Sequence, residues 1–292
     1  LMPVKDTLYF SAFGAGNGLW KSDGTARGTE LVKEIKVGGE HGAWDYYRML
    51  AGVGNTLFLS ADDGVKGTEL WKSDGTEGGT VLVKDINPDK GHSNPMMLID
   101  VDGTLFFRAD DGVHGAELWK SDGTAQGTVL VKDISSGRPG SGLKDPIAVD
   151  GMVYFWADDG IHGAELWKSD GTKTGTMLVK DINKGGSAGY PELLPHLDPW
   201  SLAIVEKDGI LFFPARDATH GTELWMSDGT KDGTVMVSDI HLSDSSYPSF
   251  LTKANNKILF RADDGTRGHE LWSLANFEHS AYVPIVLRGC CE

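Results

Sequence analysis

Short apolar runs recur along the chain, and none of them has the spacing of an amphipathic helix. Residues 105–107 (LFF) and 129–131 (VLV) are apolar at consecutive positions and lie between Gly and Asp turn signals, a pattern typical of strands covered on both faces. One stretch, 145–182, carries four such segments in order: DPIAVDG, MVYFWADDG, AELWKSDG and GTMLVKDI. We therefore predict four-stranded antiparallel units without helices.

This unit is repeated along the whole chain. Its marker is a tryptophan that recurs at intervals of 47 to 58 residues, at Trp20, Trp71, Trp119, Trp167, Trp225 and Trp272. A period of about 40 to 50 residues with strand-like content is typical of β-propeller blades. The fold class that we predict is all-β, a six-bladed β-propeller of four-stranded antiparallel blades.

The predicted propeller is a single domain over residues 1–292 that ends in a short cysteine-containing tail at 288–292. Residues 1–4 (LMPV) would supply the first strand of the first blade, and residues 280–287 (SAYVPIVL) the last strand of the sixth. The chain starts without a signal-peptide pattern, so we expect a leader to be either absent or already removed.

The repeated segment ELWKSDGT combines two buried side chains with a turn. Leu and Trp supply apolar area, while in SDGT the aspartate can accept hydrogen bonds from nearby backbone amides and the glycine can adopt a positive φ. We predict a structural turn role, rather than ligand binding, for Asp74, Asp122, Asp170 and Asp228.

The motif also carries a family resemblance. The chain resembles the ELWxxDGT-repeat proteins, whose pattern is matched at 69–76, 117–124, 165–172 and 223–230. The first repeat departs from it by reading GLWKSDGT, and the sixth by reading ELWSLANF. The resemblance implies a secreted or cell-surface propeller and says little about its ligand.

Charge excludes some classes of partner. The chain has 42 acidic and 27 basic residues, a net charge of −15, which disfavours binding to nucleic acid. No apolar run approaches the roughly 20 residues that span a bilayer, so we expect no membrane-spanning segment.

The excess of carboxylate side chains in this chain suits the binding of Ca²⁺.

An acidic segment follows the second strand of each unit from the second repeat onward, as in ADDGVHGAE at 109–117. Its carboxylates either bind Ca²⁺ or cap backbone amides and pair with a neighbouring basic residue. The candidate calcium ligands are Asp62, Asp63, Asp110, Asp111, Asp158, Asp159, Asp263 and Asp264.

Histidines occupy equivalent positions in three of these segments, at His114, His162 and His220. Equivalent loops of successive blades lie around a ring, too far apart to share a zinc ion whose nitrogen ligands stand about 2.0–2.1 Å away. We expect these histidines to contact a ligand or to form surface ion pairs.

The segments between repeats vary most, and binding residues tend to lie on variable loops of a rigid scaffold. Their aromatic side chains either stack on sugar rings or fill gaps between blades. The candidates are Trp44, Tyr46, Tyr47, Tyr190, Trp200 and Tyr247.

These features favour a non-enzymatic extracellular protein that binds a glycan or polysaccharide, with Ca²⁺ as the candidate cofactor. One alternative is a polysaccharide hydrolase or lyase, for which the non-repeated acids Asp45, Glu192, Asp198 and Glu206 are the candidates. Another is a structural or adhesive protein that binds a second protein and forms a homodimer through Cys290 or Cys291.

Overall fold

The structure is a computed structural model. It describes residues 1–12, 17–38, 48–88, 91–190, 204–255, 257–275 and 285–288. The described residues form strands, turns and loops with no α-helix among them, and no helix of this part is long and apolar enough to cross a membrane. They fall into two compact units, residues 1–153 with 169–176 and residues 154–168 with 177–292.

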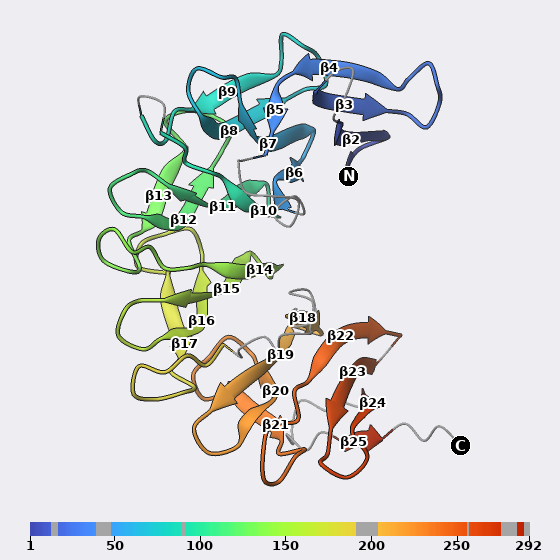
Figure 1. Ribbon diagram of the computed structural model, residues 1–292, viewed down its shortest axis with the longest axis vertical. Coiled ribbons are helices and arrows are strands. Elements are labelled where there is room, and N and C mark those ends of the chain that lie inside the picture. Colours follow the sequence, from blue (N-terminus) through green and yellow to red (C-terminus); the bar gives the residue numbers. More distant parts are fainter. Residues whose placement is uncertain are drawn as a thin grey trace. The chain divides into compact units, whose positions relative to one another are not determined.

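The described strands form six antiparallel sheets, each built from one repeat in chain order (Figure 1). The first sheet consists of β1 (Met2–Val4), β2 (Thr7–Ala12), β3 (Gly18–Ser22) and β4 (Glu30–Glu34). The second consists of β7 (Thr56–Asp62), β8 (Thr68–Ser73) and β9 (Val81–Lys84), with β5 (Lys36–Val37) and β6 (Leu50–Val53) both paired to β7. The third consists of β10 (Met96–Val101), β11 (Thr104–Asp110), β12 (Ala116–Ser121) and β13 (Val129–Lys132).

The remaining sheets repeat the same order. The fourth consists of β14 (Lys144–Val149), β15 (Met152–Asp158), β16 (Ala164–Ser169) and β17 (Met177–Lys180). The fifth consists of β18 (Val205–Lys207), β19 (Ile210–Asp217), β20 (Gly221–Ser227) and β21 (Val235–Ser238). The sixth consists of β22 (Ser249–Ala254), β23 (Lys257–Asp263), β24 (His269–Ala275) and β25 (Ile285–Arg288).

The predicted all-β character and four-stranded antiparallel units are confirmed. Residues 2–4 are the first strand of the first sheet, as expected, and residues 285–288 pair with β24 as the last strand of the sixth. The rest of the predicted segment, 280–284, lies outside the described residues. The extra strand β5 was not anticipated, and a ring of six blades remains a prediction.

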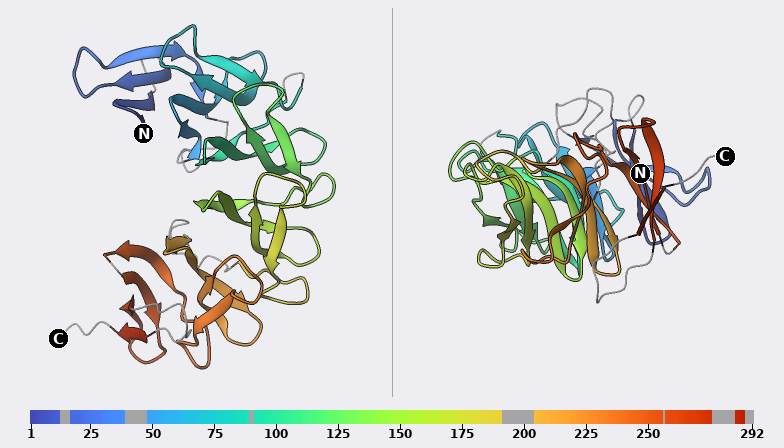
Figure 2. Two further views of the ribbon diagram at one scale, coloured as in Figure 1. Left: turned by 180° about the vertical axis from the view of Figure 1, so that it is seen from behind. Right: turned by 90° about the horizontal axis from the view of Figure 1, so that it is seen from below.

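The core lies between neighbouring sheets, which follow one another in chain order within each unit (Figure 2). Leu and Trp of the repeat are adjacent in the third strand and point to opposite faces. Leu70 of the second sheet is fully buried and belongs to the same cluster as Phe107 and Trp119 of the third. In the same way Leu19 clusters with Trp71 of the following sheet. The interface of the first sheet with the second, and that of the second with the third, each bury a leucine from one repeat beside a tryptophan from the next.

Each SDGT turn is closed by a network of side-chain hydrogen bonds. In the third sheet, Ser121 Oγ accepts from the Gly123 amide at 3.0 Å and lies 2.7 Å from the hydroxyl of Thr128. Asp122 Oδ1 accepts from the Thr124 amide at 2.8 Å and its hydroxyl at 2.7 Å, and these bonds hold the pKa of Asp122 below its usual value. Equivalent bonds occur at residues 22–29, 73–80, 169–176 and 227–234. The predicted turn role of these aspartates is confirmed.

In the first four sheets, lysines bond to the turn of the following sheet. Lys72 Nζ donates to the Gly123 carbonyl at 2.9 Å, and Lys84 Nζ donates to the Thr128 carbonyl at 2.7 Å while lying 5.9 Å from the ring centre of Trp119. We call such residues the lysine pair, with one member after the Leu-Trp of the third strand and one at the end of the fourth. The equivalent bonds printed elsewhere come from Lys21 to Gly75, Lys33 to Thr80, Lys132 to Thr176, Lys168 to Gly229 and Lys180 to Thr234.

Removing the serine of the SDGT turn should destabilise the protein more in the third repeat than in the first. Ser121→Ala leaves the Gly123 amide without a partner in a buried place and removes the bond between Ser121 and Thr128, whose hydroxyl still donates to the Thr124 carbonyl; we expect this to cost about 1–3 kcal/mol. Ser22→Ala removes the same bonds from an exposed turn, where water replaces them, so we expect a smaller loss. Urea denaturation followed by tryptophan fluorescence measures both, and equal losses would contradict this account.

Candidate functional site

Two kinds of loop lie together at one end of the second to fifth sheets. The loop between the second and third strands is here called the acidic loop, and the segment that leads from a fourth strand to the next sheet is called the return loop. In the second sheet the amides of Ser93 and Asn94, in the return loop, donate to the Thr68 carbonyl at 3.0 and 3.2 Å. The Thr68 amide in turn donates to His92 Nδ1 at 3.0 Å. The two loops therefore form one surface.

A buried glutamate fixes the return loop in place. Glu69, the glutamate of ELWKSDGT, is fully buried and accepts hydrogen bonds from the amides of Ile86, Asn87 and Ser93 at 2.8, 3.3 and 3.2 Å. The Ser93 hydroxyl donates to it at 2.6 Å. Burial outweighs these bonds and raises the pKa of Glu69 to about 7. This side chain is an internal anchor and is not available to a ligand.

The same anchor recurs in the third to fifth sheets, at Glu117, Glu165 and Glu223. Burial raises the pKa of Glu117 and of Glu165 to about 7, and also raises that of Glu223. From the sequence these glutamates belong to the acidic segments, and their role as buried anchors is not predicted. The available signal was the strand alternation, which places Glu and Trp on one face and Leu on the other.

The carboxylates of the acidic loops accept hydrogen bonds from their own loops. In the third sheet Asp110 Oδ1 accepts from the Gly112 amide at 2.7 Å, and Asp111 Oδ1 accepts from the Val113 and His114 amides at 2.9 and 2.8 Å. The other candidate calcium ligands make corresponding bonds: Asp62, Asp63, Asp158, Asp159, Asp263 and Asp264. Among the described residues, no three or more His, Cys, Asp or Glu side chains are grouped so as to hold a metal ion.

The predicted histidines are held by these loops. His114 Nδ1 lies 2.8 Å from Asp111 Oδ2, and the pairs His162 with Asp159 and His220 with Asp217 have distances of 2.7 and 2.8 Å. The hydrogen bond to Asp111 raises the pKa of His114. Burial opposes ionisation of Asp111, but the bonds from His114 and Val113 outweigh it and lower the pKa of that carboxyl.

An exposed apolar side chain precedes the basic residue at the tip of three acidic loops. Val65, Val113 and Ile161 are 62%, 65% and 72% exposed, whereas the ring of His114 is 38% exposed. In the second sheet the basic residue is Lys66, whose Nζ lies 2.7 Å from Asp85 Oδ2. Each of these loops thus presents an aliphatic group beside a basic side chain of fixed position.

The aromatic candidates are described only in part. Tyr190 is half-buried and packs edge to face on Trp156, with ring centres 5.3 Å apart. Tyr247 is half-buried, and its amide donates to the Thr222 carbonyl at 3.2 Å. The other aromatic candidates lie outside the described residues: Trp44, Tyr46, Tyr47 and Trp200.

The catalytic role of the non-repeated acids remains a prediction. Glu206 accepts a hydrogen bond from the Gly209 amide at 2.9 Å and lies 3.6 Å from Lys253 Nζ. The others, and both cysteines, lie outside the described residues: Asp45, Glu192, Asp198, Cys290 and Cys291.

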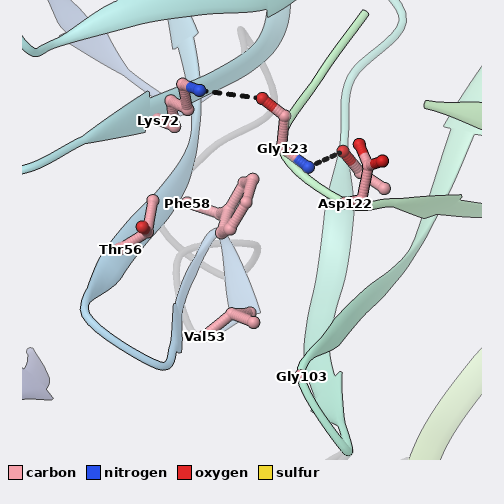
Figure 3. A pocket seen from close by; sticks show the side chains of 8 residues that line it. Val53, Thr56, Phe58, Lys72, Gly103, Asp122 and Gly123 are labelled. Carbon is pink, nitrogen blue, oxygen red and sulfur yellow. Dashed lines mark hydrogen bonds between the residues drawn. The ribbon is translucent and has the colours of Figure 1, made fainter. Parts of the chain in front are cut away.

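A small pocket of about 180 Å³ opens between the second and third sheets, on the side of the SDGT turns (Figure 3). It is lined by Phe58, Lys72 and Gly123, among others, and the bond from Lys72 to the Gly123 carbonyl closes one side. Tyr9 and Tyr154 occupy the position of Phe58 in the first and fourth sheets and place their hydroxyls against the equivalent glycines. The pocket is thus the space that a tyrosine hydroxyl fills elsewhere.

Comparison with known proteins shows similarity of fold. No protein-family model matches the chain, and no curated protein does. A mutant puromycin hydrolase in complex with PGG is similar over 92% of this chain and 42% of its own, with 14% identity and a TM-score of 0.52. A puromycin-hydrolyzing peptidase of Mycobacterium tuberculosis is similar over 92% and 40%, with 12% identity and a TM-score of 0.50.

The β-propeller domain of the Trilobed protease from Pyrococcus furiosus is also similar, over 92% of this chain and 74% of that domain, with 12% identity and a TM-score of 0.45. The chain spans about two fifths of the length of the puromycin hydrolases that it matches. At such identities these likenesses concern the fold alone.

The buried anchors make stability depend on pH. Burial raises the pKa of Glu69 from its ordinary 4.5 to about 7, so the folded chain retains a proton that the unfolded chain releases between these values. The free energy of unfolding should therefore decrease as pH rises from about 4.5 through 7. Glu69→Gln removes this titration and should flatten the decrease.

Urea denaturation at pH 5, 6, 7 and 8 provides the measurement. Glu270→Gln is the matched control, because Glu270 holds the same position in the sixth sheet but is only half-buried, and its carboxylate forms no hydrogen bond within the described residues. A pH dependence that is equally steep in the Glu69→Gln variant and in the control would contradict the role of the anchor.

Proposed function

We propose that this chain is a non-enzymatic, propeller-type binding domain that holds an extracellular glycan on its acidic loops. The observation that carries the proposal is the repeated pairing of an exposed aliphatic side chain with a histidine held by an aspartate, as in Val113 with His114 and Ile161 with His162. The proposed location outside the cell follows the resemblance to ELWxxDGT-repeat proteins.

The chemistry of the acidic loops suits such a ligand. Sugar hydroxyls are recognised by a few polar groups in fixed positions, and sugar C–H groups by apolar side chains. Each aspartate bond fixes one nitrogen of the histidine ring and leaves part of the ring exposed, while the neighbouring aliphatic group gives an apolar contact. Since equivalent loops carry the same groups, a polymer with repeating units fits this surface better than a single small molecule.

Calcium would assist this binding through the outer carboxylate oxygens. The Oδ1 atoms of Asp62, Asp110 and Asp158 accept loop amides, but no described residue donates to their Oδ2 atoms. Carboxylate oxygens of this kind are the ligands that Ca²⁺ takes. In that arrangement the cation would bridge the loop and the sugar hydroxyls.

A glycan array, run with and without EGTA, tests the proposal. We expect the chain to bind polysaccharide, and we expect His114→Gln and His162→Gln each to weaken binding about tenfold, the effect of about 1.4 kcal/mol. Lys173→Gln is the control, because Lys173 is exposed on an SDGT turn.

Loss of binding in EGTA, restored by Ca²⁺, would support the role of the loop carboxylates. Binding that is unchanged in both histidine variants would contradict the acidic loops as the site. The absence of binding across a broad array would contradict a glycan ligand.

A further inference from the structure

The first strands of the second, third and fourth sheets are neighbours in space. β6 and β10 lie side by side, and so do β10 and β14 (Figure 1). All three strands belong to the same compact unit, residues 1–153 with 169–176. Each strand starts where a return loop ends, so the starts of the three strands lie close together although they come from different repeats.

Each of these three sheets has one basic side chain at this place. Arg48 stands just before β6, and Lys144 is the first residue of β14. Both hold the position in their repeats that Met96, the first residue of β10, holds in the third. In the third sheet the basic residue is Arg108 of β11, which pairs directly with Met96 across the two strands.

Two contacts bring these side chains across the strand boundaries. Arg48 Nη1 donates to the Pro146 carbonyl at 3.0 Å, so its guanidinium reaches from the second sheet to β14, close to Lys144 along the chain. Arg108 Nη1 lies 3.1 Å from Met96 Sδ, at the start of the strand that lies between β6 and β14. We call Arg48, Arg108 and Lys144 the basic cluster.

The charge of the basic cluster contrasts with that of the whole chain, whose net charge is −15. Among the residues that start the three strands, 48–50, 94–98 and 141–146, the only acidic residue is Asp145. With Arg108 included, these strand starts therefore carry a net positive charge. Like charges that share a site repel one another, and an anion placed among them removes that repulsion.

The basic residues are not part of the repeated framework. Arg108 is replaced by Ser60 in the second repeat and by Trp156 in the fourth. The sixth repeat carries Ser249 at the position of Lys144. Sheets of the same topology thus form with and without a cation at these positions. The packing of the sheets does not explain why three consecutive repeats each place one cation here.

The backbone at these strand starts is also irregular. Met97 and Asp145 have φ angles of 58° and 48°, in the left-handed region, which is uncommon for a residue such as methionine. The pairing of β10 with β11 shifts register between Met96 and Ile99, as in a β-bulge. Such conformations persist only where the surrounding structure holds them, and bulges direct side chains out of the regular ladder. The strand starts are therefore shaped before any ligand binds.

We propose that the basic cluster binds an oxyanion, that is, a carboxylate, sulfate or phosphate group. A guanidinium presents a planar fork of N–H donors that matches two oxygens of such a group, and an ammonium supplies a point charge. The Pro146 carbonyl takes one of the five donors of Arg48, and Lys144 is exposed to solvent. This site is separate from the glycan site proposed on the acidic loops and does not rest on it.

Isothermal titration calorimetry of the full chain tests the proposal with three probes at equal ionic strength: sodium sulfate, sodium phosphate and sodium galacturonate. We expect one oxyanion to bind per chain at the basic cluster. Arg108→Gln and Lys144→Gln should each weaken this binding about tenfold, because each removes one charge-assisted hydrogen bond to the anion.

Arg138→Gln is the matched control. Arg138 is an exposed residue of the return loop that leads to β14, so its variant removes the same charge from the same end of the sheets. Binding that is unchanged in this control and weakened in both cluster variants supports the proposal. Equal weakening in all three variants shows a general effect of net charge and overturns it, as does the absence of binding of all three probes.

Thermal unfolding checks that Arg108→Gln is folded, because Arg108 is half-buried. Lys144→Gln changes an exposed side chain and provides the test if the first variant unfolds.

The probes also separate two sources of the oxyanion. Tighter binding of galacturonate than of sulfate and phosphate supports the acidic group of a sugar as the ligand of the basic cluster, and the reverse order supports a free inorganic anion. Galacturonate binding that is lost in His114→Gln and retained in Lys144→Gln belongs to the acidic loops and overturns the basic cluster as its site.

Discussion

The burial of apolar side chains between consecutive sheets is the constraint on which the rest of the structure depends. Leu70 and Trp119 come from consecutive repeats and share one cluster, so the hydrophobic core is divided among the interfaces. A single repeat has no core of its own. Burial of this kind is non-directional, and the position of one sheet on the next must be set by something else.

Polar bonds set that position. A lysine such as Lys84 extends from one sheet over a tryptophan of the next and ends on a backbone carbonyl, so its charge is satisfied only when the two sheets are in register. The complementary loss of Met226 and Ser238 from the lysine positions, where the following turn is missing, shows that the two halves of the interface change together. The repeated segment therefore supplies contacts between neighbouring sheets as well as a turn.

The loop surface is also held by hydrogen bonds that satisfy its backbone amides. Glu69 satisfies three return-loop amides from inside, and Asp111 satisfies the amides of its own loop while holding His114. The repeated acids therefore keep the loops rigid, and the groups left for a partner are the outer carboxylate oxygens, the histidine rings and the aliphatic tips. A rigid scaffold of this kind reduces the entropic cost of binding.

The sequence by itself determined the strand order, the repeat and the SDGT turn, because alternation, glycine positions and a recurring tryptophan are local signals. It also indicated the carboxylate caps of the acidic loops. Only the tertiary structure decided that Glu69 faces inward to a loop 17 to 24 residues away and that Lys72 serves a turn 51 residues later. Those bonds join segments that are distant along the chain, and no local pattern specifies which acceptor a long side chain will reach once the sheets have packed.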